Sequence, residues 1–308
     1  MKLNRKEFLD IFSSIDFNQI RDHPNILIAA RFWNEERYIA ACTCYKYMRA
    51  LDDLIDEHKA KNKLISPEER TRFKEEVRQW LMMIPGSFPD HELSKTMTRF
   101  LIPLWPFETF ARSMTYDIDH NGFPTLQSFL EYSQGAAVAP ASIFVHLNGL
   151  IEKDGRLQAP PFDVREAATP CAVFSYLVHI IRDFQKDQHN NLTYFPDDLI
   201  GKYHLTRNDL RNFANSHPIN DQFRGLIGEY YRLADDYRLK TLAVMEKINP
   251  LLEPRYQLSL RIIFDLYLMV FERIHVSTGN FTTGELNPAP DETAQRVYDT
   301  IIRFTDES

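Results

Sequence analysis

Glycine and cysteine are both scarce in this chain of 308 residues, and each shortage excludes a class of protein. The 10 glycines and the lack of any sustained alternation of apolar and polar residues argue against an all-β fold. The three cysteines, Cys42, Cys44 and Cys171, fit no disulfide framework, and Cys42 and Cys44 lack zinc-site spacing. We therefore expect them to be small buried side chains in a reducing compartment.

Basic runs and long apolar runs are also missing. The formal net charge is -7, and no stripe of lysine or arginine is present, so we expect no nucleic-acid partner. No uncharged apolar run approaches the roughly 20 residues that span a bilayer. The N-terminal stretch MKLNRKEFLDIFSSI is amphipathic and does not resemble a signal peptide. These features predict a cytoplasmic protein that touches a membrane at most at its periphery.

Helix signals follow one another along the whole chain. Hydrophobic residues make up 44% and aromatic residues 13%, which is enough for a sizeable core. Ser66 before Pro67 and two glutamates is a strong helix start. With no linker or low-complexity tract, we expect one all-α domain over residues 1–308. The expected helices cover residues 5–16, 34–59, 67–83, 88–101, 106–120, 125–147, 163–189, 206–215, 221–248, 254–276 and 291–305, with a loop over 279–290.

An acidic pattern occurs twice, each time inside an otherwise apolar helix. In YLVHIIRDFQKD, Asp183 and Asp187 are four residues apart and therefore lie on one helical face. In YKYMRALDDLID, Asp52 and Asp56 have the same spacing, with Asp53 beside them. A single DxxxD pattern usually marks a solvated face. Two copies in apolar helices favour paired or metal-bound carboxylates instead, because unpaired carboxylates are rarely buried.

The segment after Tyr132 has unusually small side chains. Gly135, Ala136, Ala137, Ala139 and Ala141 leave little bulk, and Pro140 predicts a kink in the helix. One interpretation is close packing between helices. The other is that the small residues open room for a ligand.

Two facing acidic helices would create a strongly negative pocket, which Arg49, Arg182 and Lys186 would offset only in part. A phosphorylated substrate would fit there only with divalent cations between carboxylate and phosphate oxygens. Mg²⁺ suits this role, with Mn²⁺ as an alternative. Apolar helices around such a mouth suit an amphiphile with a diphosphate head and a hydrocarbon tail, and aromatic faces can stabilise carbocations.

These motifs resemble those of the squalene/phytoene synthase family. RALDDLID at 49–56 is similar to its first acidic motif, and HIIRDFQKD at 179–187 with TYFPDDL at 193–199 is similar to its second. The resemblance covers about residues 23–274. It implies an all-α isoprenoid-synthase fold around a central apolar cavity. It also implies the head-to-head joining of two farnesyl or geranylgeranyl diphosphates through a cyclopropylcarbinyl diphosphate.

The same resemblance implies roles for individual residues. The implied Mg²⁺ ligands are Asp52, Asp56, Asp183 and Asp187. The implied catalytic residues are Tyr132, Arg182 and Asp183. The implied diphosphate contacts are His23, Tyr45, Arg49 and Tyr267. Ala137 from the small-residue run, and His179 and Lys186 from the second motif, complete the expected substrate-binding residues.

The chain also departs from the family pattern. His179 stands where the family usually has Asn, Tyr176 where it has Gln, and Leu192 where it has Arg. Pro24-Asn25 replaces a serine-rich stretch, and residues 280–292 carry no lysine or arginine. Several diphosphate ligands are thus replaced. His179 could also be a hydrogen-bonded core histidine.

Three functions therefore stay open. The first is a head-to-head prenyl synthase, the second an enzyme that ionises one prenyl diphosphate, and the third a catalytically silent relative that acts in assembly. The expected partners are prenyl diphosphates and, during product release, a membrane surface. We expect a monomer or a homodimer. No Gly-rich dinucleotide loop supports an NADPH-dependent step.

Overall fold

The computed structural model describes residues 5–18, 25–61, 65–84, 91–215 and 217–307. Most of these residues are helical, so the expected all-α fold is confirmed. The α-helices are α1 (Arg5–Ser13), α2 (Asn25–Ala30), α3 (Glu35–Lys61), α4 (Pro67–Met82), α5 (Glu92–Arg99), α6 (Trp105–Asp119), α7 (Leu126–Ser133), α8 (Ala139–Gly149), α9 (Val164–Arg182), α10 (Phe184–His189), α11 (Asp197–Lys202), α12 (Arg207–Ala214), α13 (Asp221–Ile248), α14 (Pro254–Phe271), α15 (Thr283–Leu286) and α16 (Pro290–Asp306). A π-helix, η2 (Gln134–Val138), joins α7 to α8, and a 3₁₀ turn, η3 (Asn249–Leu251), follows α13.

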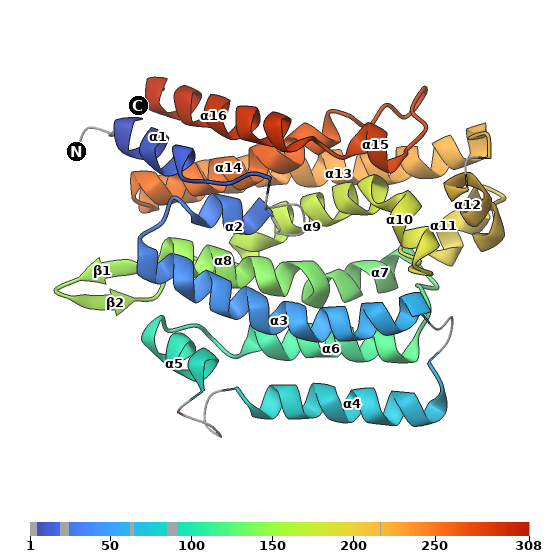
Figure 1. Ribbon diagram of the computed structural model, residues 1–308, viewed down its shortest axis with the longest axis horizontal. Coiled ribbons are helices and arrows are strands. Elements are labelled where there is room, and N and C mark those ends of the chain that lie inside the picture. The colour runs from blue at the N-terminus through green and yellow to red at the C-terminus, as the bar shows by residue number, and fades with distance from the viewer. Residues whose placement is uncertain (1–4, 19–24, 62–64, 85–90, 216, 308) are drawn as a thin grey trace.

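The long helices lie side by side with their axes running along the same direction (Figure 1). From one side of the molecule to the other, α4 packs on α6, α6 on α3 and α8, α8 on α9, α9 on α13, and α14 on α16. The helix α9 is central, since it also contacts η2 and α14. This arrangement buries the apolar face of each helix against its neighbours.

Local signals explain several helix boundaries. Ser66 caps α4 with a full capping box, in which Glu69 bonds back to the backbone of Ser66. The Asn34 side chain accepts a hydrogen bond from the backbone N–H of Arg37 at the start of α3. Helix α13 covers the expected range 221–248.

Other boundaries differ from the sequence expectation. The range 163–189 is not one helix, because Asp183 adopts φ -93° and ψ 3° and separates α9 from α10. The loop over 279–290 contains the short helix α15, and the helix from Pro254 ends at Phe271. A short antiparallel hairpin of β1 (Ile151–Lys153) and β2 (Arg156–Gln158) was not expected.

The distortion expected at Pro140 takes the form of the π-helix before it. The N–H of Ala139 donates to the carbonyl oxygen of Gln134, five residues back. A side chain at Gly135 would clash, because a Cβ there would lie 2.3 Å from the Thr109 carbonyl oxygen. Gly135 thus lets η2 approach α6 closely.

A continuous core of apolar side chains runs through the bundle, and α14 contributes a large share of it. Within the described part of the chain, we find no helix that is both long and apolar enough to span a bilayer. The three cysteines are free thiols, but only Cys44 is buried, whereas Cys42 and Cys171 are partly exposed.

Candidate functional site

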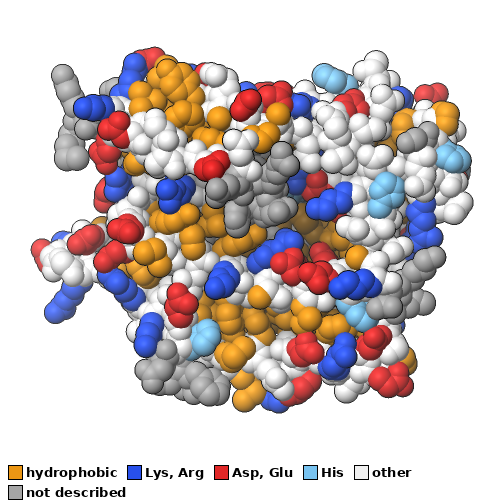
Figure 2. Space-filling view, in the orientation of Figure 1, with side chains coloured by type: hydrophobic (Ala, Val, Ile, Leu, Met, Phe, Trp, Pro, Cys, Tyr) orange, Lys and Arg blue, Asp and Glu red, His pale blue; other side chains and the backbone are white. Residues whose placement is uncertain are grey.

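A cavity of about 530 Å³ lies between α3, η2, α8, α9, α13 and α14. This volume is within the usual range for small-molecule pockets. Figure 2 shows a hollow near the centre of one face, where charged side chains border apolar ones. The wall of the cavity is mostly apolar, and its acidic residues come from the two motifs. The lining carboxylates are Asp52, Asp53, Asp56, Glu57, Asp183 and Asp187.

Burial and mutual repulsion raise the pKa values of three of these carboxyl groups. Burial raises the pKa of Asp52 to about 6, against the opposing charge of Arg49. Burial and then the charge of Asp52 raise the pKa of Asp56 to about 8. Burial, followed by the charges of Asp183 and Asp56, raises the pKa of Asp187 well above its usual range. Because Asp56 and Asp187 belong to different motifs, the two motifs lie within electrostatic reach of each other.

Asp183 differs from the other carboxylates because it has its own cation. The guanidinium of Arg182 donates two hydrogen bonds to the Asp183 carboxylate, at 2.8 and 2.7 Å. Burial alone would raise the pKa of Asp183, but the hydrogen bonds and charge of Arg182 outweigh it and lower that pKa. Arg182 is not itself part of the cavity wall, and it reaches the site through Asp183.

Arg49 is held in a similar way on the other motif. Its guanidinium lies 2.5 Å from Asp53 and 3.3 Å from Asp52. The side chain is 49% exposed and lines the cavity, so it can swing toward an incoming anion. Lys186 also lines the cavity and is exposed. Both cations thus stand at the mouth beside the carboxylates.

The small residues after Tyr132 serve both of the expected purposes. Ala136 and Ala137 face the cavity, and Pro140 and Ala141 continue that wall. Ala139, which we had grouped with them, is fully buried and packs in the core instead. Ala136 and Pro140, like Ala137 and Ala141, are four residues apart, so these four residues share the face that η2 and α8 present to the cavity.

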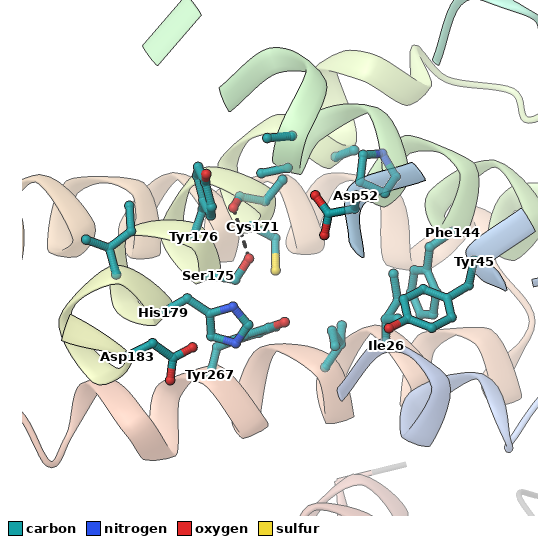
Figure 3. A pocket seen from close by; sticks show the side chains of 18 of the residues that line it. Ile26, Tyr45, Asp52, Phe144, Cys171, Ser175, Tyr176, His179, Asp183 and Tyr267 are labelled. Atoms are coloured by element: carbon teal, nitrogen blue, oxygen red, sulfur yellow. Dashed lines mark hydrogen bonds between the residues drawn. The ribbon is translucent and has the colours of Figure 1, made fainter. Parts of the chain in front are cut away.

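The other expected residues lie along the same wall (Figure 3). His179 and Tyr267 meet edge to face, with ring centroids 5.1 Å apart. Burial, and then the charge of Arg182, lowers the pKa of His179 to about 3, so its imidazole is neutral at physiological pH. Tyr45 lines the cavity near Arg49. His23 lies outside the residues that the structure describes.

Sequence reasoning missed a partly buried hydrogen-bond network around Tyr132. The Tyr132 hydroxyl donates to Asp117 Oδ2 at 2.5 Å, and Lys59 Nζ donates to Asp117 Oδ1 at 2.7 Å. Asp117 is on α6, Lys59 is in the last turn of α3, and Tyr132 is on α7. No local sequence pattern joins three residues from three helices, so only the tertiary structure reveals this network.

The carboxylate oxygens of the two acidic motifs, which form the mouth of the cavity, are ligands that suit a hard cation. Among the described residues, no group of three or more His, Cys, Asp or Glu side chains is arranged to hold a metal ion unaided. Burial first, and then the charges of neighbouring carboxylates, raise the pKa values of Asp52, Asp56 and Asp187, and the nearby lysine and arginine side chains do not compensate for this. Mg²⁺ usually takes one or two carboxylates together with phosphate oxygens, so an incomplete protein cage fits it.

Comparison with known proteins identifies the relatives of this chain. The sequence matches the profile described as "Squalene/phytoene synthase" over residues 21–293. The chain belongs to the squalene/phytoene synthase family. Among curated relatives, a phytoene synthase of Narcissus pseudonarcissus is 24% identical over 175 residues, which is 57% of this chain and 40% of that protein. Phytoene synthase 1 of Zea mays is 26% identical over 179 residues, 57% of this chain and 42% of that protein.

The match therefore spans about two fifths of the length of these curated relatives. Solved structures of the family cover more of the chain. A dehydrosqualene synthase in complex with a ligand has a TM-score of 0.71 at 14% identity and covers 99% of this chain and 98% of its own. A squalene synthase of Alicyclobacillus acidocaldarius has a TM-score of 0.58 at 16% identity, over 84% and 90% of the two chains. As a member of the squalene/phytoene synthase family, this chain thus shares the fold of these two solved structures.

Proposed function

We propose that this protein joins two prenyl diphosphates head to head, in a reaction that depends on Mg²⁺ or Mn²⁺. The observation that carries the proposal is the meeting of two acidic motifs, more than a hundred residues apart in sequence, at the wall of one apolar cavity. An acidic, cation-dependent mouth recognises a diphosphate, and the apolar interior receives a hydrocarbon tail. Membership of the squalene/phytoene synthase family supports the reaction class.

In this proposal, Asp52, Asp56, Asp183 and Asp187 hold the cation and thereby bind a diphosphate that the bare carboxylates would repel. The bound cation neutralises the charge that develops on the leaving diphosphate. The cations Arg49, Arg182 and Lys186, with the hydroxyls of Tyr45 and Tyr267, contact diphosphate oxygens. Arg182 can contact a diphosphate oxygen once the Asp183 carboxylate binds the metal ion instead of the Arg182 guanidinium.

Other residues shape the apolar part of the site. Ala137 bounds the tail, and the rings of His179, Tyr132 and Tyr267 stand where a carbocation forms once diphosphate leaves. A neutral His179 suits a position beside the carbocation, because a protonated imidazolium would repel the positive charge of that carbocation.

A second candidate is an enzyme that ionises only one prenyl diphosphate. The observation that favours it is the short supply of free cations, since Arg49 and Arg182 are already paired with aspartates. The third candidate is a silent assembly protein. It is less favoured, because all four aspartates expected to hold the cation line the cavity.

The deciding experiment uses radiolabelled farnesyl and geranylgeranyl diphosphates with Mg²⁺ and identifies the lipid products. We expect products with twice the carbon number of the substrate, and rates that rise with the square of substrate concentration when it is low. A cyclopropylcarbinyl diphosphate should accumulate when a later step is slowed. First-order rates with only monomeric products would favour the second candidate, and no turnover of either substrate would favour the third.

Replacing Ala137 by Phe tests the tail site. The larger side chain would project into the cavity, so we expect the ratio of turnover with geranylgeranyl to turnover with farnesyl diphosphate to fall sharply. Product analysis with both substrates measures this ratio. Ala50→Phe, on the exposed face of α3, is the matched control and should leave the ratio unchanged. A ratio that is equally unchanged in both variants would mean that Ala137 does not bound the tail.

A further inference from the structure

We infer that Asp117, held in place by Lys59, is a positioning residue that turns the Tyr132 hydroxyl and accepts its proton during the coupling reaction. This inference rests on the proposed function. It concerns a cluster that lies behind the cavity wall, on residues that neither acidic motif contains. Asp117 itself does not line the cavity, whereas Tyr132 does.

The geometry of the cluster fixes the direction of one O–H bond. Tyr132 donates its hydroxyl proton to Asp117, so its phenol oxygen keeps its lone pairs. The hydroxyl of Tyr176, which also lines the cavity, lies within hydrogen-bond reach of that oxygen. Lys59 holds the other carboxylate oxygen and supplies the opposite charge. The side chains of Lys59 and Asp117 are only 12% and 14% exposed, so water competes little for these hydrogen bonds.

The proposed reaction must lose one proton. The departing diphosphate takes the electron pair of its C–O bond, and the alkene of the second substrate supplies the electrons of the new C–C bond. A neighbouring C–H bond then supplies the electrons that close the three-membered ring. We assign the released proton to the Tyr132 oxygen, while the hydroxyl proton of Tyr132 moves to Asp117 Oδ2. Tyr132 ends as a neutral phenol and Asp117 as a neutral carboxylic acid. The positive charge of the carbocation and the negative charge of the Asp117 carboxylate are thus removed together.

Other groups in the wall are less suited to this role. Burial, followed by the charge of Asp117, raises the pKa of Tyr132 well above its usual range, so a free phenolate is not available as the base. A phenol that passes its own proton to a carboxylate avoids this difficulty. His179 is a poor base, because its pKa is lowered to about 3. The carboxylates of the mouth are committed to the cation in the proposed function.

The test compares two aspartates on the same helix. Asp117→Asn keeps the shape of the side chain and an oxygen that can accept from Tyr132, but it cannot take up a proton in the same way. Asp119→Asn is the matched control, because Asp119 also pairs with a lysine, Lys74, at 2.7 Å, but in a more exposed position. We expect Asp117→Asn to lower kcat by about 100-fold, the low end for general acid–base catalysis, with little change in KM. Asp119→Asn should retain wild-type kcat.

Combined variants separate this role from a structural one. If Tyr132 and Asp117 act as a unit, Tyr132→Phe with Asp117→Asn should lose no more activity than either single variant. Lys59→Arg should keep most activity, since it preserves the cation, and Lys59→Met should not. Circular dichroism and thermal unfolding check that each variant folds. If Asp117→Asn does not fold, Tyr132→Phe and Lys59→Met replace it in the same cycle.

The outcomes are distinct. Losses that multiply in the double variant, equal kcat in Asp117→Asn and Asp119→Asn, or a rise in KM alone would overturn the inference. Monomeric products from the wild-type protein would overturn the proposed two-substrate function instead. The comparison of Asp117→Asn with Asp119→Asn would still test the proton relay in that case, because a carbocation that ends as an alkene also releases one proton.

Discussion

Asp56→Asn is expected to abolish turnover while raising the free energy of unfolding at neutral pH. The Asp56 carboxyl is buried, and its pKa is raised to about 8 by burial and then by the charges of Asp52 and Asp117. Asparagine keeps the shape of the side chain but removes the charge that the fold tolerates poorly. The same charge is what the proposed cation requires, so function and stability should change in opposite directions.

The sign of the pH dependence follows from the raised pKa. An acid whose pKa is higher in the folded than in the unfolded state binds its proton more tightly when folded, so it favours folding at low pH. Its contribution is therefore lost as pH rises from the unfolded value of about 4 through the folded value of about 8. We expect wild-type stability to fall over this window more steeply than that of Asp56→Asn.

Urea unfolding across pH 4–8, with chelator present, measures the stability, and product formation with Mg²⁺ measures the turnover. Asp299→Asn, an exposed position on α16, is the control and should change neither quantity. In wild-type protein, Mg²⁺ with pyrophosphate should raise stability by about 2.7 kcal/mol at a hundred times the dissociation constant. This gain should be much smaller in Asp56→Asn. A variant that is both active and less stable would contradict the proposed role of Asp56.

The features that sequence reasoning predicted are those that local rules determine. Ser66, Asn34 and the ends of α13 follow from capping and from the start and stop of an apolar pattern. The four paired aspartates were found because their spacing is visible within one helical turn. The all-α fold follows from helix signals along the whole chain and from the scarcity of glycine.

The features that were missed depend on the tertiary structure. Helix α9 ends at Asp183 although no proline or glycine follows. At this helix end the guanidinium of Arg182 pairs with the carboxylate of Asp183. The pairing of Asp117 with Tyr132 and Lys59 joins three helices. Whether a small residue such as Ala137 or Ala139 faces the cavity or the core depends on how η2 and α8 pack against their neighbours, which no local sequence pattern shows.

Arg182→Met is expected to reduce both turnover and stability, in contrast to Asp56→Asn. Arg182 donates two hydrogen bonds to Asp183, and their side chains are only 18% and 24% exposed. Loss of the guanidinium leaves the Asp183 carboxylate unpaired beside Asp187. The carboxyl group of Asp187 is already repelled by the charge of Asp56. Because the pair is neither fully buried nor exposed, we expect the free energy of unfolding to fall by about 2 kcal/mol.

Turnover in Arg182→Met should fall by about 100-fold or more, as when one donor to a developing negative charge is removed. Arg182→Lys keeps the charge but loses the planar fork, so we expect it to restore most of the stability and only part of the turnover. Urea unfolding and product formation measure the two effects in the same preparations. Arg49, whose side chain is more exposed than that of Arg182, should instead affect KM more than stability. Equal stability of Arg182→Met and wild type would mean that Asp183 does not need its neighbouring cation, and the proposed exchange of Arg182 between Asp183 and diphosphate would lose its basis.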